Sequence, residues 1–218
     1  MNRYGICFPC GVALSEVLRG IREGQLRHFD FGRRLRWVRT IAAAVARLHS
    51  GDVTHGDLKP HNIILRMPTA QGREEIYMTG FGSAKVMESQ KPAERAVSPM
   101  ETLQYTAPEV LRHAPRQYSS VDVYALSVLS WEILSVATPF GGMAAPALRE
   151  VVCSGARPSI PMDWEPAVRT AIERGWDANA AKRGTVHDFL ATMFGPSAAS
   201  ADDSDVGQSA ASVAGEKR

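Results

Sequence analysis

Four side chains that could take part in catalysis lie within the stretch VTHGDLKPHNIIL, residues 53–65. They are His55, Asp57, Lys59 and Asn62. A carboxylate can accept a proton from a hydroxyl group, an amide oxygen can bind a hard cation, and a lysine can neutralise developing negative charge. A His-Gly-Asp turn alone is common in loops, so these residues need support from the rest of the chain.

The stretch is flanked by regular elements. Between residues 31 and 50, apolar side chains recur at spacings of three and four, which predicts one face of a long helix; they are Phe31, Leu35, Val38, Ile41, Val45 and Leu48. Gly51 ends this helix. The isoleucine-rich segments 62–65 and 75–78 are typical of short strands. The four polar side chains are therefore expected in a loop between a helix and a strand.

The rest of the chain is predicted to be mostly helical. Residues 121–134 are apolar nearly all round, which suits a helix in the middle of a core. Residues 186–194 have an apolar face, and Thr185 with Asp188 forms a capping-box pattern before them. The first twenty residues favour a short strand, a turn and a short helix. The sequence thus predicts a mainly α (α+β) fold with a few short strands.

Composition gives bounds on domain organisation and partners. With 218 residues, 44% apolar and 22% charged, the chain suits one globular domain, predicted over residues 1–194. Residues 195–218 are small and polar, which predicts a disordered tail. The formal charge of +2 favours neither nucleic acid nor a membrane surface as a partner. The apolar region 121–140 contains Glu132 and several serines, so no membrane span is expected.

The three cysteines favour a reducing compartment, so a cytoplasmic location is expected. Cys7 and Cys10 form a CFPC motif, which could be a redox pair or half of a zinc site. Cys153 is the only other thiol, and no second pair completes four ligands. Chance spacing is the preferred interpretation of the motif.

The stretch 53–65 resembles the catalytic loop of eukaryotic protein kinases. The family pattern has His, Arg and Asp, with Asn five residues beyond the Asp, and His55, Asp57 and Asn62 match it in type and spacing. Four further features match in the right order: Phe81 and Gly82 of the DFG motif, the segment TLQYTAPE at 102–109, Asp122 at the start of a central helix, and Trp176-Asp177 with Arg183. The aminoglycoside and choline kinase-like group shares the HGD loop but lacks the APE segment and the helix that carries Asp122, so the protein kinase resemblance is preferred.

The resemblance implies roles for these residues. Asp57 would accept the proton of the substrate hydroxyl, Lys59 would neutralise the moving phosphoryl group as in serine/threonine kinases, and Asn62 would bind magnesium. Thr102 would contact the substrate. His55, Phe81, Glu109, Asp122 and Arg183 would be structural, with Arg183 paired to Glu109. ATP and Mg2+ are the implied cofactors, and a protein is the implied substrate or partner.

The chain departs from the family pattern in three ways. Gly56 stands where the family has an arginine that pairs with a phosphate on the activation segment. Gly80 replaces the Asp of DFG and offers no ligand to magnesium. No glycine-rich loop precedes the catalytic loop, and the first lysine is Lys59, so the chain resembles the hinge and C-terminal lobe with most of the N-terminal lobe absent.

Two functions follow from these matches and departures. The first is a catalytically impaired, pseudokinase-like module that works by binding a protein. The second is an active serine/threonine kinase whose N-terminal lobe is supplied in trans or is missing from this gene model. A remnant without a selected function is a third possibility.

Overall fold

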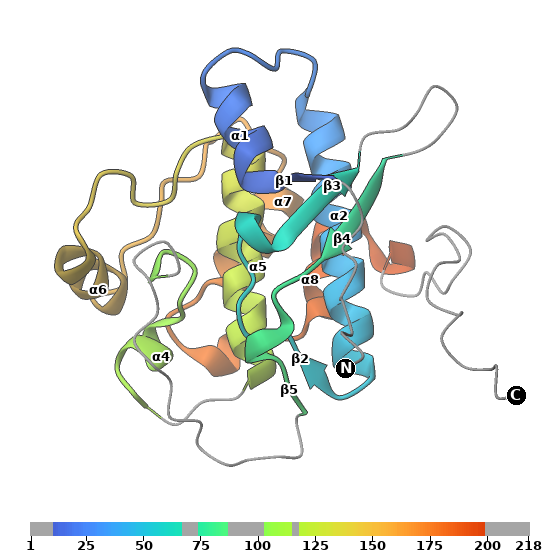
Figure 1. Cartoon of the computed structure of the whole chain (residues 1–218). Helices are drawn as coiled ribbons and strands as arrows, with labels where there is room; N and C mark the ends of the chain where they lie inside the picture. The colour runs from blue at the N-terminus through green and yellow to red at the C-terminus, as the bar shows by residue number, and fades with distance from the viewer. Residues whose placement is uncertain (1–10, 67–73, 87–102, 115–117, 199–218) are drawn as a thin grey trace, which may run out of the picture.

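The computed structural model describes residues 11–66, 74–86, 103–114 and 118–198 (Figure 1). The strands are β1 (Val12–Ala13), β2 (Val53–Thr54), β3 (Ile63–Arg66), β4 (Glu75–Met78) and β5 (Lys85–Val86). The α-helices are α1 (Leu14–Arg22), α2 (Phe31–Ser50), α4 (Pro108–Leu111), α5 (Tyr118–Ser135), α6 (Ala145–Cys153), α7 (Pro166–Gly175) and α8 (Val186–Phe194). Short 3-10 turns are η1 (Pro60–Asn62), η2 (Phe81–Ser83), η3 (Ala180–Lys182) and η4 (Pro196–Ala198).

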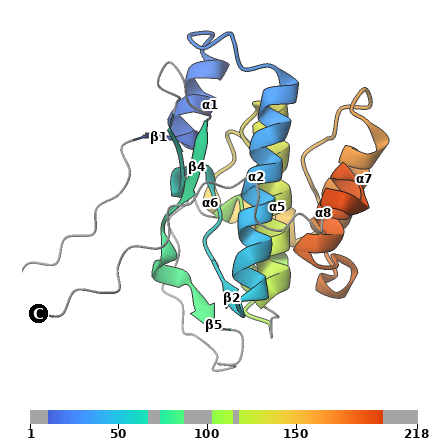
Figure 2. The same ribbon diagram turned by 90° about the vertical axis from the view of Figure 1, so that its right-hand side faces the viewer.

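Helix α5 is the centre of the molecule. Every residue from Ser120 to Leu134 is buried, because α2 packs along it on one side and α7 on another. Helix α8 contacts both α2 and α7. Figure 2 shows the resulting layers, with the strands on one side, α2 and α5 in the middle, and α7 with α8 on the other side. Such an apolar helix is stable only when neighbours cover all of its faces.

Helix α2 begins and ends where its sequence signals lie. The side chain of Asp30 accepts a hydrogen bond from the backbone N–H of Arg33 at 2.7 Å, which caps the first turn. Gly51 follows the last residue. The face toward the core consists of Trp37, Val38, Ile41, Ala42, Val45 and Ala46. The helix is followed directly by β2 and then by residues 55–62, which are called the catalytic loop below after the family segment they resemble.

Two small antiparallel sheets hold the ends of that loop. Strand β3 lies between β1 and β4, with Ile64 opposite Tyr77 and Ala13. Strand β2 pairs with β5, where Val53 faces Val86. The loop therefore leaves one sheet and enters the other, and both of its ends are fixed by backbone pairing.

The structure confirms the mostly helical fold with small sheets. Helix α2 and strand β4 have the predicted bounds, and α5 extends the predicted helix to 118–135. The strand predicted at 62–65 is shifted by one residue, because Asn62 belongs to the turn η1. The Thr185–Asp188 capping box is present at α8. None of the described helices combines the length and hydropathy that a membrane crossing requires.

Some predictions concern the chain ends. The expected first strand, Cys7 and Cys10 lie outside the described residues, as do residues 199–218 of the expected tail. Within the segment predicted to be disordered, Pro196–Ala198 form the turn η4, and Ala198 is buried. The described residues therefore include the first four of the segment predicted as a tail, and the predicted boundary at residue 194 stays a prediction.

Candidate active site

The catalytic loop is anchored to the core by Asp122 at the start of α5. Its carboxylate accepts the backbone N–H of His55 at Oδ2 and that of Gly56 at Oδ1, each at 2.8 Å. The Nε2 atom of His49, near the end of α2, lies 2.9 Å from Oδ2. The Asp122 side chain is only 1% exposed, so its charge is stabilised by these donors rather than by water.

His55 ties the loop to the segment after β4. Its Nδ1 accepts the backbone N–H of Asp57 at 3.2 Å, so Nε2 is the ring nitrogen that carries hydrogen and donates to the Thr79 carbonyl oxygen at 2.8 Å. The ring also packs against Phe81, with ring centroids 4.9 Å apart. His55 thus fixes the loop relative to residues 79–81.

Three of the predicted catalytic residues meet at Asp57. Lys59 Nζ lies 2.9 Å from Asp57 Oδ2. The Asn62 amide nitrogen donates to the same oxygen at 3.0 Å and to the Asp57 carbonyl at 2.7 Å. These distances bring a carboxylate, an ammonium group and an amide together at one point of the loop. A carboxylate in this position has the chemistry of a general base.

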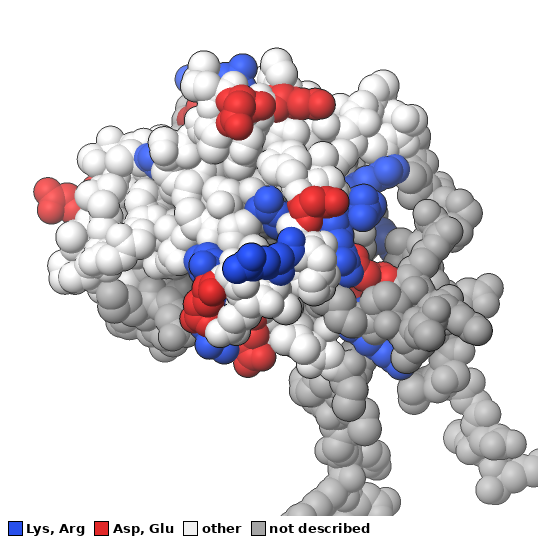
Figure 3. Space-filling model, turned by 90° about the horizontal axis from the view of Figure 1, so that it is seen from above, with Lys and Arg blue, Asp and Glu red and all other residues white. Residues whose placement is uncertain are grey.

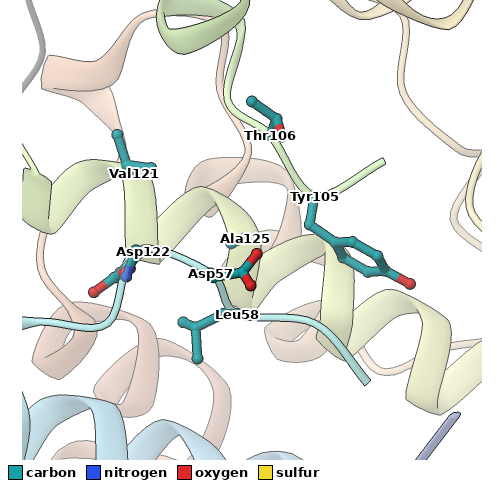
Figure 4. Close-up of a pocket in the computed structure, with 8 residues that line it drawn as sticks. Asp57, Leu58, Tyr105, Thr106, Val121, Asp122 and Ala125 are labelled. Atoms are coloured by element: carbon teal, nitrogen blue, oxygen red, sulfur yellow. The ribbon is translucent and has the colours of Figure 1, made fainter. Parts of the chain in front are cut away.

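Asp57 lines a shallow pocket between the catalytic loop, the segment before α4 and the first turns of α5. Figure 4 shows this pocket, whose walls are Gly56, Asp57, Leu58, Tyr105, Thr106, Val121, Asp122 and Ala125. Tyr105 and Thr106 belong to the segment in which Thr102 was predicted to contact the substrate. Thr102 itself lies outside the described residues.

Gly80 lies directly against Asn62. Its backbone has φ +80° and ψ 28°, which is the left-handed conformation that glycine adopts easily. A Cβ atom built on Gly80 would lie 2.5 Å from both Oδ1 and Nδ2 of Asn62. The space that a side chain at position 80 needs is therefore filled by the amide of Asn62.

The remaining donors do not make up a magnesium site of the family type. Magnesium requires several oxygen ligands in octahedral geometry, and usually one or two carboxylates. Gly80 supplies none, and Asp57 Oδ2 is already shared by Lys59 and Asn62. In the described part of the chain, His, Cys, Asp and Glu side chains nowhere gather in groups of three or more that could hold a metal.

Gly56 also has a left-handed backbone, with φ +74°. A Cβ atom there would lie 2.8 Å from the carbonyl oxygen of Ser83. The position that carries arginine in the family is thus covered by the turn η2. A longer side chain would have to push this turn away.

Glu109 and Arg183 form the ion pair that the resemblance implies. Arg183 Nη1 and Nη2 donate to the two carboxylate oxygens at 2.7 and 2.8 Å. The guanidinium also donates to the carbonyls of Ser120 and Asp177, at 3.0 and 2.8 Å. Its carbon lies 5.0 Å from the centroid of the Tyr124 ring. Helix α4 is held in this way against α5 and the loop before α8.

Sequence reasoning missed a second polar cluster, formed by Tyr105, Glu132 and Arg22. The Tyr105 hydroxyl donates a short hydrogen bond to Glu132, and Arg22 Nη1 lies 3.2 Å from the other carboxylate oxygen. Burial raises the pKa of Glu132, although the hydrogen bonds from Tyr105 and Arg22 oppose this effect. Burial also raises the pKa of Tyr105 well above its usual value. A lone glutamate in an otherwise apolar helix was the signal that this cluster gave in the sequence.

Comparison with known proteins agrees with this geometry. Residues 11–194 match the model of the protein kinase domain. The chain is 30% identical over 160 residues to the serine/threonine/tyrosine-protein kinase HT1 of Arabidopsis thaliana, covering 73% of this chain and 39% of the relative. It is 33% identical over 174 residues to the serine/threonine-protein kinase PknA of Mycobacterium tuberculosis, covering 79% and 37%.

A putative serine/threonine-protein kinase/receptor, R818 of Acanthamoeba polyphaga mimivirus, is 29% identical over 160 residues, which cover 71% of this chain and 9% of the relative. The match thus spans well under half the length of each of these relatives. The anchored loop, the Glu109–Arg183 pair and the match over residues 11–194 lead to one conclusion. The chain belongs to the protein kinase family.

Proposed function

We propose that this kinase domain works mainly by binding a protein and that its phosphoryl transfer is impaired. The observation that carries the proposal is Gly80, which offers no carboxylate to a metal and lies against the amide of Asn62. Protein kinases generally use ATP with Mg2+, and the metal neutralises charge that develops on the phosphates. Without that metal, the rate of transfer falls by many powers of ten.

The parts that preserve the kinase shape are intact, which supports a binding role. The Asp122 carboxylate holds the catalytic loop, and the Glu109–Arg183 pair holds α4. A domain that has lost chemistry but kept its frame can still present a surface to a partner.

Several large apolar side chains on the strand side of the molecule are exposed. Val12, Phe81 and Val86, from β1, η2 and β5, are 42%, 45% and 53% exposed. Figure 2 shows β1 and β5 at opposite ends of that side, so these side chains offer separate apolar contact points to a partner. On the face seen in Figure 3, acidic and basic groups are intermixed with much uncharged surface. This favours a protein partner over a nucleic acid or a membrane. A cytoplasmic location stays part of the proposal.

An active serine/threonine kinase is the second candidate. The observation that favours it is the geometry at Asp57, where Lys59 and Asn62 lie 2.9 and 3.0 Å from the carboxylate. Groups that hold the phosphates of ATP would then come from outside residues 11–194, in another chain or in a longer protein. A protein hydroxyl would be the acceptor, as the family implies.

One assay separates the two candidates. The purified chain is incubated with Mg-ATP and a generic protein substrate, beside the Asp57→Ala variant. We expect no transfer above the level of the variant and no thermal stabilisation by Mg-ATP. Transfer that Asp57→Ala abolishes would establish the second candidate and refute impaired catalysis.

A further inference from the structure

We propose that Gly80 is a structural requirement of this site, because the turn that it begins is seated on the catalytic loop in the space a metal carboxylate would need. The site then holds no magnesium, and a carboxylate cannot be restored at position 80 without displacing Asn62. This inference concerns metal binding and backbone shape. It rests on the same Gly80 contact as the proposed function, but its readouts are separate, because metal binding and folding stability are measured without a partner or a substrate.

The backbone around Gly80 is fixed on both sides. The Thr79 N–H donates to the Asn62 carbonyl at 2.9 Å, and the Thr79 carbonyl accepts from His55 Nε2 at 2.8 Å. After Gly80, the Ala84 N–H donates to the Phe81 carbonyl at 2.9 Å and closes the turn η2. A shift of residue 80 away from Asn62 would therefore disturb the two Thr79 hydrogen bonds, which also hold the catalytic loop.

The Asn62 side chain is fixed equally well. Its amide nitrogen donates to both the carbonyl and the carboxylate of Asp57. Lys59 binds the same carboxylate and neutralises its charge. Swinging the amide aside to admit a side chain at position 80 would break both of its hydrogen bonds.

A second glycine lets the same turn approach the loop. Gly56 has φ +74°. A Cβ atom at this position would lie 2.8 Å from the Ser83 carbonyl oxygen, so the absence of a side chain leaves room for that oxygen. The turn η2 thus contacts the catalytic loop at both of the turn's ends. Gly80 lies against Asn62 at the start, and Ser83 lies against Gly56 at the end. An aspartate at position 80 would meet the amide of Asn62, the other residue that the family pattern assigns to magnesium.

A thermal unfolding series tests the steric part of the proposal. Gly80→Ala adds only a Cβ, and we expect its Tm to fall by at least about 4 °C, because the backbone is left-handed and the space is filled. Gly82→Ala is the matched control, since its Cβ would meet no atom within 4 Å. Its Tm is expected to change little. Equal shifts in the two variants would overturn the proposal.

A double-mutant cycle separates backbone strain from the contact with Asn62. The loss caused by Gly80→Ala is expected to be smaller in an Asn62→Ala background, because the amide is then gone. Additive losses would refute the claim that the Asn62 amide fills the space.

Magnesium binding is tested on the unmodified chain, so this measurement does not depend on a variant that folds. Titration calorimetry and thermal unfolding with millimolar MgCl2 are compared with the same measurements in EDTA. We expect no binding heat and no rise in Tm for the unmodified chain. Gly80→Asp is expected to show neither a binding heat nor a magnesium-dependent rise in Tm. A magnesium-dependent rise in either protein would overturn the proposal. Phosphoryl transfer is not part of this readout, so failure here is distinct from failure of the proposed function.

Discussion

Asp122 shows how a single side chain sets the shape of the catalytic loop. Two consecutive backbone N–H groups, of His55 and Gly56, point at its two oxygens, and His49 supplies a third contact. A buried carboxylate is costly unless such donors surround it. The loop is therefore held where these N–H groups converge, and this geometry places Asp57 at the pocket.

Glu132 gives the residue-scale prediction, which is a pH dependence. Burial raises its pKa above the ordinary value of 4.5, so the folded chain binds the proton more tightly than the unfolded chain does. The stability contributed by Glu132 is fully present below the ordinary pKa of 4.5, and it is lost as pH rises through the higher pKa of the folded chain. The Glu132→Gln variant should lack this loss.

Denaturant unfolding at a series of pH values measures this effect. We expect the free energy of unfolding of the unmodified chain to fall relative to that of Glu132→Gln as pH rises above 4.5. The expected change is a steady fall with pH, and its direction follows from the raised pKa of Glu132. The exposed Glu150→Gln change is the control. If the difference in unfolding free energy between the unmodified chain and Glu132→Gln did not vary with pH, the prediction would be contradicted. Because His61 lies near Glu132, the series is repeated in a His61→Ala background.

At the scale of elements, sequence patterns predicted those helices and strands whose signals are local. The 31–50 helix has a capping aspartate, a periodic apolar face and a terminal glycine, and the structure gives it the same bounds. The 121–134 segment is apolar all round, and it is buried all round. Local capping and periodicity are sufficient for such elements.

Other elements depend on contacts that a sequence does not show. Strand β5 has two residues and exists because it pairs with β2, which lies 31 positions earlier in the chain. The buried Ala198 is held by packing against α8. None of these features follows from a window of neighbouring residues.

The packing of α7 on α5 gives the element-scale prediction. Gly175 lies so close to α5 that a Cβ would collide with the Ser127 hydroxyl, which itself donates to the Val123 carbonyl at 2.8 Å. Gly175→Ala should lower the free energy of unfolding by about 1–3 kcal/mol. Gly32→Ala, in the exposed first turn of α2, should be neutral or stabilising, because alanine favours helix.

Urea unfolding of the two variants measures the difference. A Ser127→Ala change should recover part of the loss in Gly175→Ala by removing the hydroxyl. If Gly175→Ala were as stable as Gly32→Ala, close packing of these helices would be refuted.

At the scale of the whole molecule, the sequence indicated which residues belong together but not how they are joined. His55, Asp57, Lys59 and Asn62 meet in one loop, because their spacing is short. The contact between His49 and Asp122 spans 73 positions and requires α2 to lie along α5. The Tyr105–Glu132–Arg22 cluster likewise joins three separate segments. Long-range polar contacts are set by packing, which no local pattern encodes.

The Glu109–Arg183 pair spans 74 positions and gives the last prediction. Arg183 is almost fully buried, and its hydrogen bonds join α4, α5 and the loop before α8. Replacing it by methionine would leave Glu109 and two carbonyl groups without their donor. Arg183→Met should therefore lower the free energy of unfolding by about 3–5 kcal/mol.

The matched control for this change is Arg19→Met, because Arg19 and Glu23 form an exposed pair at 3.8 Å. Its loss should stay below about 0.5 kcal/mol, since exposed pairs contribute little. The stability loss of Arg183→Lys should lie between those of Arg183→Met and Arg19→Met. Lysine keeps the charge but cannot donate to both oxygens of Glu109 in a planar fork. A further Glu109→Gln change should restore part of the stability of Arg183→Met, because it removes the unpaired carboxylate. If Arg183→Met lost no more stability than Arg19→Met in urea unfolding, the Glu109–Arg183 pair would not be what holds α4 against the core.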